Sequence, residues 1–199
     1  MAVMGKNWID SPHGFAGSFL GLAGLLVIAI VVISKLDPIG VKEHKDTGVS
    51  RPLFKILSQP IFIISVSAGA IGFSVMSYLM TATPLSMHEL EGHSLEMTKW
   101  VIQSHIIAMY LPSLFSAFLV RYLGLPKLMI LGSIIYGIVV LIALSGQQVM
   151  HYWWALVLLG IGWNFLYTSG TLLLPSSYES SERFKTQAMN DFSIFIVQA

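Results

Sequence analysis

The sequence of 199 residues contains no cysteine and few charged side chains. The absence of cysteine excludes disulfide bonds, thiolate metal sites and cysteine nucleophiles within this sequence. Charged residues make up 11% of the total, whereas soluble domains carry about 25%. The net charge of +1 excludes a nucleic-acid-binding protein that relies on bulk positive charge. What remains is a strongly apolar sequence with a mean hydropathy of +0.74, for which lipid is a better solvent than water.

Long apolar runs dominate the sequence. A sixth run begins near Ala188 and is cut off at Ala199, and it follows five complete ones: Phe15–Ser34, Pro60–Thr83, Lys99–Val120, Leu128–Leu144 and Tyr152–Leu174. Each complete run has about the 20 residues that an α-helix needs to cross a bilayer, and a backbone in lipid must satisfy its own hydrogen bonds. We therefore predict an all-α fold, a polytopic membrane helix bundle with five complete transmembrane helices and a truncated sixth.

The segments between the runs alternate in positive charge. If the runs cross a membrane in turn, Ser34–Leu57, Arg121–Lys127 and Pro175–Gln187 lie on one side. These three segments carry nine of the eleven lysines and arginines, namely Lys35, Lys42, Lys45, Arg51, Lys55, Arg121, Lys127, Arg183 and Lys185. The positive-inside rule places this side in the cytoplasm, so the first run leads from outside to inside.

The fifth run carries the strongest cluster of polar and aromatic residues within a predicted span: Trp163, Asn164, Tyr167, Thr168 and Thr171. Its polar members recur every three or four residues, which places them on one helix face. If this face borders a cavity, it can hydrogen-bond a polar solute while Trp163 stacks on that solute. If it meets another helix, Asn164 and the threonines join helices instead. The sequence leaves both interpretations open.

Four further residues are weaker candidates, because polar groups inside a membrane span are costly and often functional. Gln103 and His105 lie in the third run, and His105 can carry a coupled proton near neutral pH. A histidine hydrogen-bonded between helices is the favoured interpretation. Tyr78 and Thr81 lie near the outer end of the second run. They either line the outer half of a solute pathway or, as we favour, have a structural role at the helix end.

An acidic residue and a histidine-rich segment complete the search for chemistry. Asp191, at the start of the sixth run, is a candidate gate or coupling carboxylate, although a helix N-terminus stabilises an acidic residue in any case. His88 and His93 flank two glutamates, but their spacing of five does not match the four-residue spacing of zinc proteases. No P-loop, dinucleotide fingerprint or nucleophile elbow occurs. We predict no metal site, no cofactor and no enzymatic activity.

Several local strings resemble the C-terminal half of bacterial transporters of the major facilitator superfamily. They are Gln59-Pro60 with Met80-Thr81-Ala82-Thr83-Pro84-Leu85, Val101-Ile102-Gln103-Ser104-His105, Met109-Tyr110-Leu111-Pro112-Ser113, Leu159-Gly160-Ile161-Gly162-Trp163-Asn164-Phe165, and Ser181-Glu182-Arg183 with Gln187-Ala188-Met189-Asn190-Asp191-Phe192. The turn Arg121–Lys127 resembles the short basic turn that the superfamily repeats in each half. Val120 stands where that turn commonly has aspartate, and Arg121 is the gate candidate that this resemblance supplies.

The resemblance implies a division of the chain. Residues 1–34 would hold an outer segment and the last helix of the N-terminal half, residues 35–57 the cytoplasmic loop between halves, and residues 58–199 an incomplete C-terminal bundle. As part of a full-length protein, the chain would then belong to a secondary active transporter in a bacterial inner membrane. Such transporters expose a central site to opposite sides in turn.

The partners that the resemblance implies are a small-molecule substrate, the lipid bilayer and the missing transporter half. Proton coupling is one option, and riboflavin is one candidate solute. The alternative hypothesis is a non-transporting membrane scaffold or partner-binding protein derived from a degenerate transporter half.

Overall fold

The computed structural model describes residues 16–36 and 50–198. The chain divides into two units, Met1–Lys45 and Asp46–Ala199, and each is described by itself. Most of the predicted outer N-terminal segment and of the predicted inter-half loop lies outside the described residues. No strand occurs in the two described ranges, so the prediction of an all-α fold is confirmed for this part of the chain.

The first unit contributes one helix, α2 (Ala16–Ser34). Apart from glycine and serine, its residues are all apolar, and a helix that is apolar on every side suits a lipid surrounding. Its last turn is closed by Ser34 Oγ, which donates to the carbonyl oxygen of Val31 at 2.8 Å. The first predicted apolar run is therefore helical from Ala16 onward.

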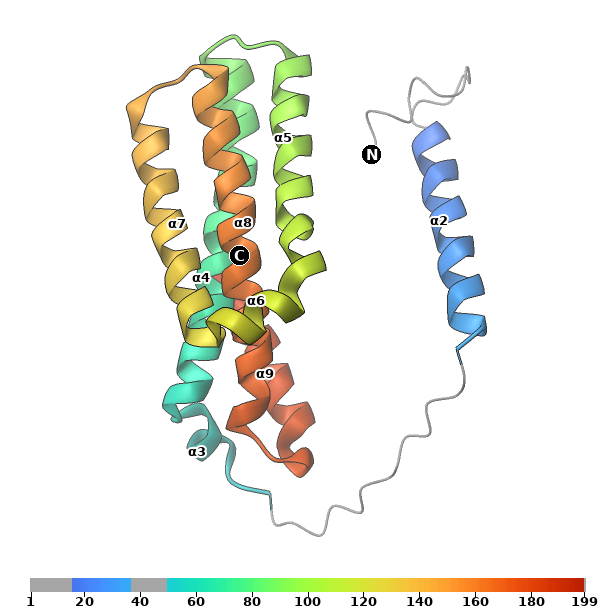
Figure 1. Cartoon of the computed structure of the whole chain (residues 1–199), viewed down its shortest axis with the longest axis vertical. Coiled ribbons are helices and arrows are strands. Elements are labelled where there is room, and N and C mark those ends of the chain that lie inside the picture. The colour runs from blue at the N-terminus through green and yellow to red at the C-terminus, as the bar shows by residue number, and fades with distance from the viewer. Residues whose placement is uncertain (1–15, 37–49, 199) are drawn as a thin grey trace. The chain divides into compact units, whose positions relative to one another are not determined.

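The second unit is a helix bundle (Figure 1). Its helices are α3 (Leu53–Leu57), α4 (Pro60–Leu85), α5 (Leu95–Tyr110), α6 (Ser116–Leu123), α7 (Leu125–Ser145), α8 (Val149–Leu173) and α9 (Arg183–Gln198). Four continuous stretches are long and apolar enough to cross a membrane: Pro60–Leu90, Leu95–Leu123, Leu125–Ser145 and Val149–Ser177. The predicted polytopic membrane bundle is thereby confirmed.

Two helix boundaries differ from those predicted. Helix α4 passes through Pro84 and continues as a π-helical turn over Ser86–Leu90. The proline removes one backbone hydrogen-bond donor, but here it does not end the helix. Helix α9 begins at Arg183 rather than near Ala188. A reciprocal capping box between Glu179 and Glu182 starts the turn before it, whereas the apolar run becomes visible only after the charged first turn.

Pro112 interrupts the helix of the third span. Helix α5 gives way to a 3₁₀ turn at Leu111–Phe115, and α6 then leaves the direction of α5 (Figure 1). Proline lacks the amide hydrogen that a continuing α-helix would need at this point. The basic turn predicted around Arg121 is the end of α6 followed by Gly124, whose φ of 76° requires glycine.

Helix α8 is the centre of the bundle. Helices α4, α5 and α7 each pack against α8 and surround it in Figure 1. Helices α5 and α8 come close together at Gly160, where an added Cβ would lie 2.9 Å from the carbonyl oxygen of His105 and 2.9 Å from the amide nitrogen of Met109. Small residues permit such close backbone contact between membrane helices, so the sequence of α8 sets the distance to α5.

Candidate functional site

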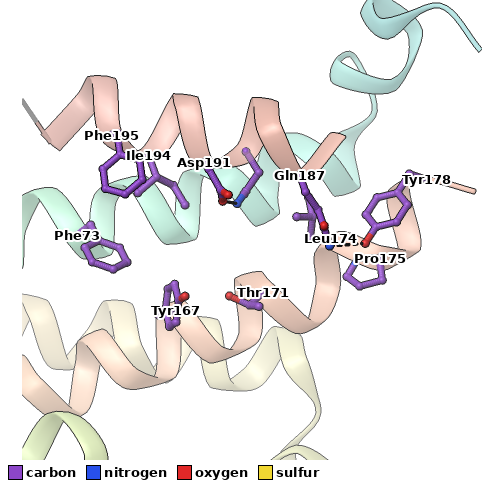
Figure 2. A pocket seen from close by; sticks show the side chains of 11 residues that line it. Phe73, Tyr167, Thr171, Leu174, Pro175, Tyr178, Gln187, Asp191, Ile194 and Phe195 are labelled. Carbon is purple, nitrogen blue, oxygen red and sulfur yellow. Dashed lines mark hydrogen bonds between the residues drawn. The ribbon is translucent and has the colours of Figure 1, made fainter. Parts of the chain in front are cut away.

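A cavity of about 400 Å³ lies between α8 and α9. It is lined by Phe73, Tyr167, Thr171, Leu174, Pro175, Tyr178, Gln187, Asn190, Asp191, Ile194 and Phe195. Tyr167 and Thr171 of α8 point across the cavity toward α9, which contributes Gln187 and Asp191 (Figure 2). Tyr167 and Thr171 were candidates from the fifth run and Asp191 from the sixth, and the structure brings the three to one cavity.

The aromatic wall of the cavity is held in a defined orientation. The ring of Tyr167 stacks on that of Trp163, with centroids 5.0 Å apart and planes 8° from parallel. Phe73 of α4 meets both rings edge-on, each at 5.3 Å between centroids. Such edge-to-face and stacked pairs are favourable geometries for aromatic rings. Trp163 is itself buried and does not line the cavity, so it supports Tyr167 from behind.

The polar wall of the cavity contains hydrogen-bonding groups and one carboxylate. Gln187 Nε2 donates to the hydroxyl oxygen of Tyr178 at 3.2 Å, and Asn190 Nδ2 donates to Asp191 Oδ1 at 3.0 Å. No lysine or arginine is among the lining residues. A cavity that combines aromatic rings with hydrogen-bonding groups from both α8 and α9 suits a small, flat, polar solute.

Asn164 faces away from this cavity. Its Nδ2 donates to the carbonyl oxygen of Met109 at 2.8 Å and to Ser113 Oγ at 2.6 Å. The side chain is 3% exposed. Of the two interpretations that the sequence left open for Asn164, the structure displays the one in which it joins helices. Thr168 is half-buried and does not line the cavity either.

His105 is also placed between helices. It is fully buried, and its Nδ1 donates to the carbonyl oxygen of Leu156 in α8 at 2.7 Å. Its Nε2 has no hydrogen-bond partner among the described residues. Gln103 is half-buried on the same helix. Neither residue lines the cavity between α8 and α9.

The remaining candidates lie apart from the cavity. Arg121 is exposed on α6. Thr81 is exposed and donates from its hydroxyl to the carbonyl oxygen of Ser77, a bond within its own helix. Tyr78 is 72% exposed and borders a second cavity of about 250 Å³, which His151 and Tyr152 also line.

One prominent polar contact was not predicted from the sequence. Glu182 is fully buried and forms an ion pair with Arg51, with 2.5 Å between Arg51 Nη2 and Glu182 Oε2. The guanidinium of Arg51 lowers the pKa of this carboxyl from 4.5 to about 2, although burial acts in the opposite direction. The two residues are 131 positions apart, so no local pattern could have joined them.

Comparison with known proteins identifies relatives of this chain. The riboflavin transporter RfnT of Brucella anthropi is 40% identical over 185 residues, which cover 91% of this chain. Two proteins of Bacillus subtilis, the uncharacterized MFS-type transporters YdeG and YddS, are 40% and 39% identical over 96% of it. This chain is a relative of the major facilitator superfamily transporters. No family model and no solved structure matches it.

The family resemblance predicted from local strings is thereby confirmed. The major facilitator relatives are longer: this chain spans about half of each, since the matched regions cover 46%, 46% and 49% of their lengths. With four helices of membrane-spanning length among the described residues and major facilitator relatives, this chain is an integral membrane protein.

Proposed function

We propose that the chain forms one side of the solute pathway of a secondary active transporter, and that the cavity between α8 and α9 is its solute site. The observation that carries this proposal is the convergence of Tyr167, Thr171 and Asp191 on one cavity. Discontinuous and polar membrane helices commonly form the sites of such transporters. The transporter names of the relatives support the same conclusion.

Riboflavin is the leading candidate solute. It is the solute in the name of the Brucella anthropi relative, which is 40% identical to this chain. The isoalloxazine ring is flat and aromatic, with hydrogen-bonding groups along its edge. The exposed part of Tyr167 offers a stacking surface, and Gln187 and Thr171 offer hydrogen-bonding partners on the facing walls.

We assign proton coupling to Asp191. Its carboxylate lines the cavity, whereas His105 is fully buried between α5 and α8. A coupling group must exchange its proton with water and sense the solute, and the cavity gives Asp191 access to both. The membrane that contains the protein is proposed to be a bacterial inner membrane, in line with the bacterial source of the relatives.

The test uses the complete reading frame that encodes this chain, reconstituted in proteoliposomes. We expect riboflavin uptake above that of empty liposomes, with accumulation when a pH gradient is imposed. Tyr167→Ala should raise KM roughly 2- to 10-fold, because an aromatic pair contributes about 0.5–1.5 kcal/mol. Tyr122→Ala is the matched control, since Tyr122 is exposed on α6 and does not line the cavity.

Each component of the proposal has its own contrary result. If the protein moves other solutes but not riboflavin, the solute assignment is wrong and the pathway stands. If Asp191→Asn still accumulates solute against its gradient, Asp191 does not couple protons. If no member of a broad solute panel is moved under any gradient, the transporter proposal fails.

A further inference from the structure

The contact between Arg51 and Glu182 joins two distant segments at one end of the bundle. Arg51 donates from its backbone nitrogen and from Nε to Glu182 Oε1, each at 2.8 Å. Its Nη2 lies 2.5 Å from Glu182 Oε2. The backbone nitrogen of Glu179 donates to the same Oε2 at 3.1 Å. A carboxylate this buried is costly unless it is paired and hydrogen-bonded, and here four donors satisfy it.

Further bonds fasten the same two segments to one another. The carbonyl oxygen of Ser177 accepts from Arg51 Nη2 at 3.2 Å and from Gln59 Nε2 at 2.9 Å. From the start of α9, Lys185 Nζ donates back to Ser50 Oγ and to the carbonyl oxygen of Arg51. The segment that precedes α4 is thus bonded to both the turn after α8 and the first turn of α9.

The fastened turn is also a wall of the cavity. Leu174, Pro175 and Tyr178 line it from the segment between α8 and α9. Figure 2 shows Pro175 and Tyr178 at one end of the cavity, beyond Gln187. Ser177 lies between these lining residues and is 1% exposed. Its bonds to Arg51 and Gln59 therefore hold the backbone that places Pro175 and Tyr178.

We propose that Arg51 and Glu182 are positioning residues, a clasp that holds the turn 174–178 in the geometry with which it bounds the solute site. This inference rests on the proposed function of the cavity. Because the clasp draws on the segment before α4 and on the start of α9, it ties both helices to the same wall. The clasp is expected to affect the affinity for the solute, not proton coupling.

The clasp is permanent rather than switched by physiological pH. The pKa of Glu182 is lowered to about 2 by the Arg51 guanidinium, and arginine stays protonated throughout. The other charged groups near the pair are Glu179, Arg183 and Lys185. The backbone nitrogen of Glu179 also donates to the Glu182 carboxylate, which further favours its ionised form. The pair is therefore ionised at every pH at which the protein works.

The experiment uses the complete reading frame, with Ser177→Cys as a reporter. This chain has no other cysteine, and labelling at residue 177 by N-ethylmaleimide is read by mass spectrometry of its peptide. The reporter is combined with Arg51→Gln, Glu182→Gln and both together. We expect labelling at least 10-fold faster in each, with KM for riboflavin raised about 5-fold or more and the maximal rate nearly unchanged. The double variant should be no worse than either single one.

Controls separate the clasp from general effects. Lys55→Gln removes a nearby positive charge that is exposed on α3, and it should leave labelling and KM unchanged. Arg51→Lys keeps the positive charge, so it remains informative if Arg51→Gln fails to fold. Its labelling rate and KM should lie between those of the original protein and of Arg51→Gln. The amount of folded protein in each sample is measured by size-exclusion chromatography.

The outcomes are distinct. Unchanged labelling in Arg51→Gln and Glu182→Gln would show that the pair does not hold the turn, whatever happens to transport. Faster labelling with unchanged KM would make the pair structural and would overturn its positioning role. If the unaltered protein moved no solute at all, the proposed function would fail, while labelling would still decide whether the clasp holds residue 177.

Discussion

Replacing Gly160 by alanine tests how closely α5 and α8 must approach. The new Cβ would lie 2.9 Å from the carbonyl oxygen of His105 and from the amide nitrogen of Met109. These are backbone atoms, which cannot rotate away as a side chain can. The two helices must therefore separate, and the bonds from His105 to Leu156 and from Asn164 to Met109 must lengthen with them.

The magnitude follows from two opposing contributions. Overpacking of a well-packed contact costs about 1–3 kcal/mol. Alanine is favoured over glycine within a helix by roughly 0.5–1 kcal/mol. Gly137 in α7 provides the matched control, because an added Cβ there meets nothing within 4 Å. Since both variants share the gain in helix preference, Gly160→Ala should be about 1–3 kcal/mol less stable than Gly137→Ala.

The assay is equilibrium unfolding in mixed micelles with an increasing fraction of denaturing detergent, followed by tryptophan fluorescence. Trp163 and the Trp100–Trp153 stack provide signals on the two helices concerned. If Gly160→Ala and Gly137→Ala unfold at the same detergent fraction, the close contact between α5 and α8 does not exist and the packing described here is wrong.

Two further predictions concern polar contacts. The pKa of Glu182 is lower in the folded protein than in the unfolded chain. Its contribution to stability is therefore complete above about pH 4.5 and is lost as pH falls toward 2. The difference in thermal stability between the unaltered protein and Glu182→Gln should shrink over that range, and a constant difference would contradict this pKa. Asn164→Leu removes two hydrogen bonds to the region of Met109 and Ser113 and should cost about 0.5–2 kcal/mol in mixed-micelle unfolding, whereas an unchanged midpoint would mean that these bonds contribute nothing.

The helices of membrane-spanning length were predictable because their cause is local. A run such as Leu128–Leu144 must be helical in lipid whatever its neighbours are, and the structure has α7 over Leu125–Ser145. The break at Pro112 was predictable for the same reason, since a missing amide hydrogen acts within one turn. The start of α9 was not, because the capping box at Glu179 precedes the apolar run that marked the helix.

The candidate site was predictable only in part. A polar face at helical spacing indicated Tyr167 and Thr171 together with Asn164. Which side of that face meets a cavity depends on how α5 and α9 pack against α8, and this is a property of the whole bundle. Asn164 lies one helical turn from Thr168 and Tyr167 in sequence, yet it bonds to Met109. The pairing of Arg51 with Glu182 likewise arises only from tertiary structure.

The central position of α8 has a consequence for how the protein is made. Helices α4, α5 and α7 each pack against α8, and all three precede it in the sequence. During synthesis they enter the bilayer before the helix that they contact exists. Until α8 is inserted, His105 therefore lacks its hydrogen-bond partner, the carbonyl oxygen of Leu156 in α8. The packing of α4, α5 and α7 against α8 therefore cannot begin before Val149–Leu173 has entered the membrane.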